Sequence, residues 1–322
     1  MKQLHALSLA FLVVNAATAA AQSFPSRPVT IVVGFAAGGP SDTIARLMTE
    51  PMRRVLGEPV IVENVSGAAG AVGILRVVRS APDGYLLSLG NWSSHVGAPG
   101  TNPGPFDVLR DLEPVARMPI APLLIVGKQT LSPNNVRELI AWLKANPDKA
   151  SAGIVGFGSA SHVSGIYFQQ KTGTSFQFVP YRGGAPATQD LLSGQIDLRL
   201  GTEASQVLAY MRAGKVKPYA VLAKTRWRPA PDIPTIEEAG VPDLHIALWH
   251  GLWAPKGTPR DVIVKLNAAV VAALADPVVR ARLEALGMEI PAQQTPEALG
   301  AFHQAEIGKW WPVIKAAGIK PQ

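Results

Sequence analysis

The sequence predicts an α/β protein with two domains. Its length of 322 residues is about twice the roughly 150 residues of a typical domain. Short apolar runs rich in β-branched residues alternate with segments of helical periodicity, the pattern of largely parallel sheets with right-handed crossover helices. Hydrophobic residues make up 48% of the chain and charged residues only 16%, so there is material for large cores and too little charge for a disordered chain.

The first third contains three predicted strands and two predicted helices. The run VTIVVG is continuous and β-branched, as expected for a strand buried on both faces. Pro51 removes a backbone donor inside the first helix, so we expect a kink or an interruption there. In chain order, the strands are predicted at 29–34, 60–63 and 86–89, the helices at 41–56 and 68–79, and a Gly- and Pro-rich loop at 91–105.

The rest of the chain continues the alternation and then becomes helical. Each of the last three helices begins with Pro at or near its first position, where the missing N–H costs little. The predicted strands are 123–126, 152–155, 178–179, 196–200 and 219–222, and the predicted helices are 132–145, 161–171, 185–192, 205–212, 259–274, 277–286 and 296–315.

Composition excludes several classes of function. The chain has no cysteine, which excludes a disulfide scaffold, a thiolate zinc site, a cysteine nucleophile and a lipid anchor on cysteine. The net charge is +7, but the basic residues are spread along the chain, so we expect a basic surface and no nucleic-acid partner. His245 and His250 are five residues apart and no HExxH motif is present, so no metal and no cofactor are predicted.

The N-terminus has the pattern of a signal peptide. Lys2 supplies a positive charge, residues 7–14 (LSLAFLVV) form an apolar core, and Ala19-Ala20-Ala21 matches the small-residue cleavage rule. The apolar run is too short to span a membrane, and a buried N-terminal helix is the alternative. We predict that the protein is exported and that cleavage after Ala21 removes residues 1–21.

Ligands of open α/β sheets lie beyond the carboxyl ends of the strands. The loop 34–41 (GFAAGGPS) matches the phosphate-binding pattern GxxxxGK[ST] at its glycines and serine, but Pro40 replaces the essential lysine. What remains is a site for an anion such as a carboxylate at a helix N-terminus. The alternative is a tight turn with a helix capped by Ser41 or Asp42.

A second loop, 156–164 (GFGSASHVS), leaves two interpretations open. It is a neutral polar loop at another helix start, and it also contains Ser159, Ser161 and His162, the residue types of a serine hydrolase. The GxSxG elbow is absent and no acidic partner is near in sequence, so His162 equally fits a capping or packing role. Three similar loops, at 89–95, 181–186 and 201–203, each come directly after a predicted strand. The aromatic side chains of Trp92 and Phe157 are candidates for the walls of a pocket.

Several motifs in order carry a resemblance to a known family. They are FPSRP at 24–28 followed by VTIVVGFAAGGPSDTIAR, VIVENVSGAAGAVG at 60–73, APDGY at 81–85, GSASH at 158–162, VPYRGGAPATQDLLSGQID at 179–197, RAGKVK at 212–217, IPTIEEAG at 233–240 and WHGLWAPKGTP at 249–259. Over nearly all of the mature chain, the sequence resembles the Bug-type extracytoplasmic solute receptors, the periplasmic binding components of tripartite tricarboxylate transporters.

The resemblance implies a two-domain periplasmic binding protein fold of the type II kind, with a ligand cleft between the lobes. We place domain 1 at 22–124 plus 249–322 and domain 2 at 125–248. It further implies a non-enzymatic, monomeric receptor that captures a small carboxylate and delivers it to membrane subunits of the transporter. An exported serine hydrolase and a receptor that signals to a membrane sensor remain as alternatives.

The resemblance also implies a set of ligand-binding residues at the cleft. This chain departs from the family pattern at Ala37, where Pro is common, and at Asn91-Trp92, which add bulk. It departs again at 201–203, where many relatives carry an aspartate and this chain reads Gly-Thr-Glu with a one-residue shift. The predicted ligand-binding residues are Phe35, Ala36, Ala37, Gly38, Gly39, Ser41, Asp42, Asn91, Trp92, Ser93, Ser94, Gly158, Ser159, Ser161, His162, Tyr181, Arg182, Gly183, Gly184 and Thr202.

Overall fold

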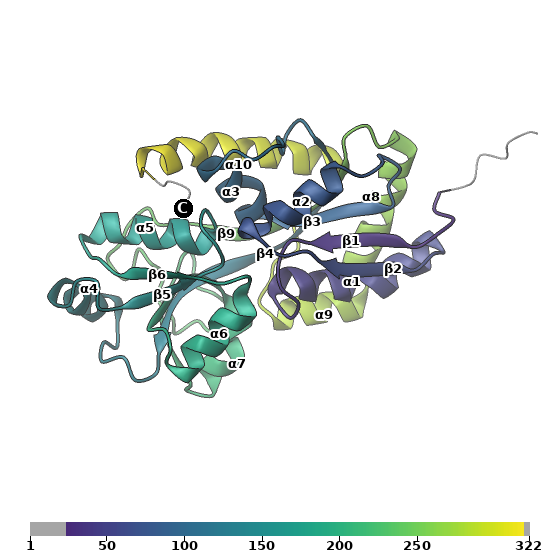
Figure 1. Cartoon of the computed structure of the whole chain (residues 1–322). Helices are drawn as coiled ribbons and strands as arrows, with labels where there is room; N and C mark the ends of the chain where they lie inside the picture. Colours follow the sequence, from purple (N-terminus) through teal and green to yellow (C-terminus); the bar gives the residue numbers. More distant parts are fainter. Residues whose placement is uncertain (1–23, 319–322) are drawn as a thin grey trace, which may run out of the picture.

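The computed structural model describes residues 24–318, so the predicted signal peptide lies outside the described residues. Figure 1 shows two groups of elements, one around β1, β2 and β3 and the other around β5 and β6, with β4 running between them. The strands of the described residues form one path in the order β2-β1-β3-β9-β4-β7-β5-β6, and β8 pairs with β4 beside that path.

The first group is built on three parallel strands, with β1 pairing with both neighbours. The apolar run predicted as a doubly buried strand forms β1, and its residues are buried except for the half-buried Thr30. The strands are β1 (Val29–Val33), β2 (Val60–Asn64) and β3 (Leu86–Asn91).

The second group repeats this arrangement. Strand β5 pairs in parallel with β6 and β7, and β8 is antiparallel to β4. These strands are β5 (Ser151–Ile154), β6 (Gln177–Pro180), β7 (Leu198–Glu203) and β8 (Val216–Val221).

Two long strands, β4 (Leu112–Lys128) and β9 (Ala247–Pro255), connect the groups. Residues 112–122 of β4 pair antiparallel with β9, and residues 123–128 pair antiparallel with β7 and β8. The sequence predicted only 123–126 of β4 and no strand at 247–255. The rest of β4 was missed because it contains prolines, which argue against a central strand and occur mainly in edge strands and at bulges. In the structure the register of β4 against β9 indeed shifts after Pro114 and around Pro119. The expectation of largely parallel sheets therefore holds within each group and fails at the connecting strands.

The helices cover both faces of each group. In the first group, α1, α8 and α9 pack one face of the sheet, while α2 and α10 lie on the other. Helix α1 runs without a break through Pro51, so the predicted interruption is wrong; Met48 and Met52 on either side of the proline are fully buried and hold this turn in place. These helices are α1 (Pro40–Leu56), α2 (Ala71–Val78), α8 (Arg260–Ala275), α9 (Pro277–Ala285) and α10 (Pro296–Ala316).

In the second group, α4 and α5 pack on one face and α6 and α7 on the other. Successive residues of β4 point to opposite faces of the sheet: Ile125 packs in the core under α4 and α5, and Val126 packs in the core under α6 and α7. These helices are α4 (Val136–Ala145), α5 (Ala160–Thr172), α6 (Gly184–Ser193) and α7 (Ala204–Arg212).

The segment 91–105 was predicted as a loop, but it is partly helical. A π-type turn, η2 (Ser93–Gly97), leads directly into α3 (Ala98–Thr101). The side-chain oxygen of Asn91 accepts hydrogen bonds from the backbone N–H groups of Ser93 and Ser94, which stabilises the helical start. The other predicted helix nearby, 68–79, is divided at Gly70 (φ 101°) into the 3₁₀ turn η1 (Ala68–Gly70) and α2.

No single helix within residues 24–318 is long and apolar enough to cross a membrane; α8 and α9 reach that length only as a pair bent by 67°.

Candidate functional site

Helices from both groups begin at one small cavity, which we call the inner cavity. It has a volume of about 40 Å³, which is room for a carboxylate group or a few waters. It is lined by Phe35, Gly39, Pro40, Ser41, Asn91, Ser93, Val155, Ala160, Ser161, Gly184, Arg199, Gly201, Glu203, Gln206 and Leu248.

The helix starts at the inner cavity create a site for negative charge. Helix α1 begins after Gly39 and helix α6 after Gly183, and neither N-cap offers a side chain to the free N–H groups of the first turn. Helix α5 also begins there, but its N-cap Ser159 accepts a hydrogen bond from the N–H of His162. Unpaired N–H groups at helix starts, with the helix dipoles behind them, favour an anion.

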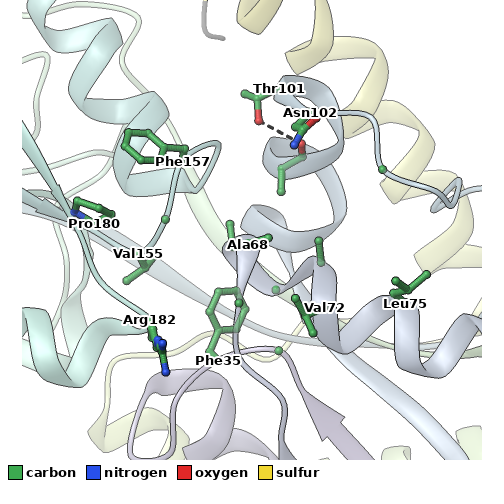
Figure 2. Close-up of a pocket in the computed structure, with 18 of the residues that line it drawn as sticks. Phe35, Ala68, Val72, Leu75, Thr101, Asn102, Val155, Phe157, Pro180 and Arg182 are labelled. Carbon is green, nitrogen blue, oxygen red and sulfur yellow. Dashed lines mark hydrogen bonds between the residues drawn. The ribbon is translucent and has the colours of Figure 1, made fainter. Parts of the chain in front are cut away.

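A second, larger cavity adjoins the first, and we call it the outer cavity. It measures about 500 Å³, and Phe35 and Val155 line both cavities. Figure 2 shows Val155, Phe157 and Pro180 on one side of it and Ala68, Val72 and Asn102 on the other. Its remaining lining comes from Gly34, Gly67, Ala69, Gly70, Ala71, Leu75, Ala98, Thr101, Gly104, Pro105, Phe106, Gly156, Tyr181 and Arg182.

The first predicted loop is held in shape by Asp42. Its carboxylate accepts hydrogen bonds from the N–H of Gly38 (2.9 Å), Nε of Arg46 (2.9 Å) and Nδ2 of Asn64 (3.0 Å). Burial raises the pKa of Asp42, but these donors outweigh it and the pKa lies below its ordinary value. Asp42 is therefore an ionised group that fixes the loop, and it lines neither cavity.

Residues at the end of β3 and just after it are hydrogen-bonded to the starts of both α1 and α5. The side-chain amide of Asn91 donates to Oγ of Ser41 (3.1 Å), and Oγ of Ser93 accepts from the N–H of Ala160 (2.9 Å). The Trp92 ring is fully buried and packs edge-on against Trp310 with centroids 5.4 Å apart, so its bulk lies in the core and lines neither cavity.

The start of α5 does not form a serine–histidine pair. Oγ of Ser159 and Oγ of Ser161 are hydrogen-bonded to each other at 2.9 Å. Nδ1 of His162 accepts the backbone N–H of Gly158 at 3.0 Å, and burial lowers the pKa of His162 to about 4. Among the described residues neither serine is hydrogen-bonded to the ring, so the geometry required for a base-activated hydroxyl is not assembled here.

The loop before α6 touches the first loop directly. The N–H of Ala36 donates to the carbonyl oxygen of Arg182 at 3.4 Å. A Cβ added at Gly183 would lie 3.0 Å from Cβ of Ala36, so glycine permits this close approach. The Tyr181 hydroxyl donates to Asp190 at 2.6 Å and is already engaged.

Two ionisable residues of the inner cavity, Arg199 and Glu203, were missed as site residues. Both are on β7 and are 2% and 3% exposed. They lie on the same face of the strand as Gly201, whereas the predicted Thr202 is buried and lines neither cavity. The alternation of side chains along a strand was the available signal, but its phase could not be read from the sequence.

The two residues differ in charge state. Burial raises the pKa of Glu203 to about 8, against the opposing effects of Ser205 and Arg199, so its carboxyl is neutral at pH 7. Burial lowers the pKa of Arg199 to about 10, so the guanidinium remains charged at pH 7. The guanidinium donates through Nη1 to the Gly184 carbonyl oxygen (3.3 Å) and to Oε1 of Gln206 (3.2 Å).

The structure brings about half of the predicted residues to a cavity. Those that line one are Phe35, Gly39, Ser41, Asn91, Ser93, Ser161, Tyr181, Arg182 and Gly184. Those that line neither are Ala36, Ala37, Gly38, Asp42, Trp92, Ser94, Gly158, Ser159, His162, Gly183 and Thr202. Within residues 24–318, no group of three His, Asp or Glu side chains could hold a metal ion.

Comparison with known proteins decides the family. A model described as the tripartite tricarboxylate transporter family receptor matches residues 44–319. The chain belongs to this receptor family. Solved structures agree: the periplasmic binding protein BugD is 39% identical, with a TM-score of 0.89 over 93% of this chain and 100% of that one.

Two further solved structures contain a ligand. MatC from Rhodopseudomonas palustris with bound malate is 37% identical, with a TM-score of 0.87 over 90% of this receptor and 100% of MatC. Rpa4515 from R. palustris with adipate is 32% identical, with a TM-score of 0.88 over 93% of this receptor and 100% of that chain. The predicted Bug-type resemblance and the periplasmic binding protein fold of this receptor are therefore confirmed.

Proposed function

We propose that this receptor holds a small organic carboxylate at the inner cavity and delivers it to membrane subunits of a tripartite transporter. The observation that carries the proposal is that the uncapped starts of α1 and α6, one from each group of strands, line the same small cavity. The neutral side chains of Ser41, Asn91 and Ser93 add hydrogen-bonding groups there. Malate and adipate, in the structures of two relatives, are both small organic carboxylates.

The test is a thermal-shift screen of the mature protein with dicarboxylates, tricarboxylates, aromatic acids and amino acids. A ligand that binds only the native state raises the melting temperature. We expect at least one carboxylate to raise it while neutral analogues do not. Failure of every carboxylate, with neutral compounds binding instead, would contradict the proposal.

We propose that the receptor has no hydrolase activity, because Ser159 and Ser161 are bonded to each other and His162 Nδ1 is occupied by the Gly158 N–H. Chromatography of each ligand after prolonged incubation with the protein is expected to recover it unchanged. Turnover that is lost in Ser161→Ala would establish an enzyme.

We propose that the receptor consists of two lobes, 22–124 plus 249–322 and 125–248, that close on the ligand as a monomer. Support comes from β4, which changes its pairing partners between Pro122 and Leu123, and from β9, which starts at Ala247. Small-angle scattering is expected to give a monomer with a smaller radius of gyration when ligand is saturating. Equal radii with binding confirmed would contradict closure.

We propose that the receptor is exported to the periplasm and cleaved after Ala21, on the strength of the apolar core and the small residues before Gln22. Mass spectrometry of protein from the native periplasm is expected to give an N-terminus at or near Gln22. An intact Met1 would contradict this.

A further inference from the structure

Two buried polar atoms at the inner cavity have no partner among the described residues. They are Nε of Arg199 and Oε2 of Glu203. Both side chains line this cavity and are almost completely buried. A buried donor or acceptor without a partner is costly, so a bound group that satisfies both atoms at once would gain hydrogen bonds that the protein alone does not make.

The charge of this pair selects the bound group. The guanidinium of Arg199 is cationic, and the acidic group that acts on it is Glu203, whose carboxyl is neutral at pH 7. The neutral carboxyl of Glu203 has Oε1 engaged by the Ser205 hydroxyl at 2.8 Å, which leaves Oε2 free to carry the proton. A cation next to a neutral donor suits a carboxylate, which accepts a charge-assisted hydrogen bond from each.

The outer cavity has the opposite character. Apart from glycines, most of its lining is Ala, Val, Leu, Pro and Phe, and Arg182 is the single charged residue of the described lining. Two of its polar side chains are already engaged, because the Thr101 hydroxyl donates to the Ala98 carbonyl oxygen and the Tyr181 hydroxyl to Asp190. Its volume of about 500 Å³ lies within the roughly 300–1,000 Å³ of small-molecule sites.

We propose that Arg199 and Glu203 bind the carboxylate head of the ligand and that the rest of the ligand is an apolar body that occupies the outer cavity. The inference rests on the proposed function and narrows it to one class of organic acid. Acids with an aliphatic or aromatic body belong to this class. Short acids with several carboxylates or hydroxyls do not, because their additional polar groups would face apolar walls.

Calorimetric titration of the wild-type receptor with a graded series of acids tests the apolar body. Butyrate, hexanoate and octanoate differ only in methylenes, and each methylene removed from water is expected to tighten binding about three- to fourfold until the cavity is filled. Benzoate is expected to bind like hexanoate, and citrate more weakly than either. Citrate binding more tightly than hexanoate, or affinities independent of chain length, would overturn the inference while leaving a carboxylate receptor intact. If no acid of any kind binds, the proposed function itself fails.

A pair of variants tests the head group. Glu203→Gln keeps a neutral hydrogen-bond donor of the same shape, and Glu203→Leu removes it. We expect Glu203→Gln to bind hexanoate within about threefold of wild type and Glu203→Leu to lose at least tenfold, since a hydrogen bond to a charged group is lost. Equal affinity of the two variants would overturn the role of Glu203. If Glu203→Leu does not fold, a loss of more than tenfold in Glu203→Gln would contradict a neutral donor.

A matched pair of surface variants tests the wall. Val72 lines the outer cavity and is 45% exposed on α2, and Val271 is 40% exposed on α8 and lines neither cavity. Val72→Asn is expected to weaken octanoate more than butyrate, whereas Val271→Asn changes neither. The same loss for both acids, or no loss, would overturn the placement of the ligand body.

Discussion

Oγ of Ser93 accepts a hydrogen bond of 2.9 Å from the backbone N–H of Ala160, the first residue of α5. Ser93 follows β3 and Ala160 follows β5, so this bond joins the two groups of strands at the inner cavity. It uses an N–H group of a helix start that has no partner within its own helix.

Removal of this bond is expected to weaken ligand binding. Ser93→Ala is expected to destabilise the conformation in which the two groups of strands are in contact by about 1 kcal/mol, the value of one hydrogen bond. A ligand that binds only this conformation would then bind about fivefold more weakly. Ser164→Ala is the matched control, because Ser164 is buried on α5 and its hydroxyl has no partner. Calorimetry measures both. Tighter binding by Ser93→Ala would mean that the ligand takes the Ala160 N–H in place of the serine.

The start of α1 gives a second prediction. Gly39→Val places a branched side chain at the uncapped N-cap and blocks approach of the carboxylate to the first-turn N–H groups. The loss of one charge-assisted hydrogen bond, about 1.5–3 kcal/mol, predicts roughly ten- to a hundredfold weaker binding. Gly308→Val is the control, since an added Cβ there meets nothing within 4 Å. Unchanged affinity in a folded Gly39→Val would remove this loop from the site.

Buried histidines predict a loss of stability in mild acid. Burial lowers the pKa of His162, His250 and His303 to about 4, so each is neutral in the folded state while the unfolded chain takes up a proton below about pH 6.5. Between pH 6.5 and 5.5 each of these histidines costs about 1 kcal/mol of folding stability, because the unfolded imidazole is only half protonated at pH 6.5. Glu203, with its raised pKa, offsets slightly more than one of them.

The melting temperature is therefore expected to fall from pH 6.5 to 5.5, by roughly 3–6 °C for a net loss near 2 kcal/mol. Differential scanning calorimetry of the unliganded protein measures it. His303→Gln is expected to show a smaller fall than wild type. A melting temperature that is constant or rises over this interval would contradict neutral burial of these rings.

The neutral state of Glu203 predicts a pH dependence of binding. Its pKa of about 8 is raised by burial, while Ser205 and the charge of Arg199 act to lower it. The ligand anion binds the protonated form, so affinity is expected to be constant below pH 8 and to fall by up to about tenfold per pH unit above it. Calorimetry from pH 6.5 to 9.5 tests this, and Glu203→Gln is expected to abolish the fall. Identical profiles for the two proteins would contradict the assignment.

The sequence predicted the position of the inner cavity better than the side chains that line it. Glycine- and serine-rich loops after apolar strands located the starts of α1, α5 and α6, because ligands of such sheets lie at the carboxyl ends of the strands. The side chains that face the cavity depend on strand register. Arg199, Gly201 and Glu203 alternate onto the cavity face of β7, and a shift of one residue selects Thr202 instead.

Tertiary packing decided the features that local patterns missed. The direction of Trp92 is set by its contact with Trp310, more than two hundred residues away in the chain. The length of β4 was hidden by prolines that a connecting strand accommodates at bulges. Local patterns also assigned residues 91–105 to a loop, where the Asn91 side chain in fact starts a helical turn.

The central claim is that one carboxylate contacts helix starts from both groups of strands. Nuclear magnetic resonance of ¹⁵N-labelled receptor during titration with the tightest acid measures this through the backbone amides of Ser41, at the start of α1, and Gly184, at the start of α6. We predict that both amide signals shift and that they saturate at the same ligand concentration. A shift of only one of them, or of neither while binding is confirmed by calorimetry in the same sample, would contradict the account.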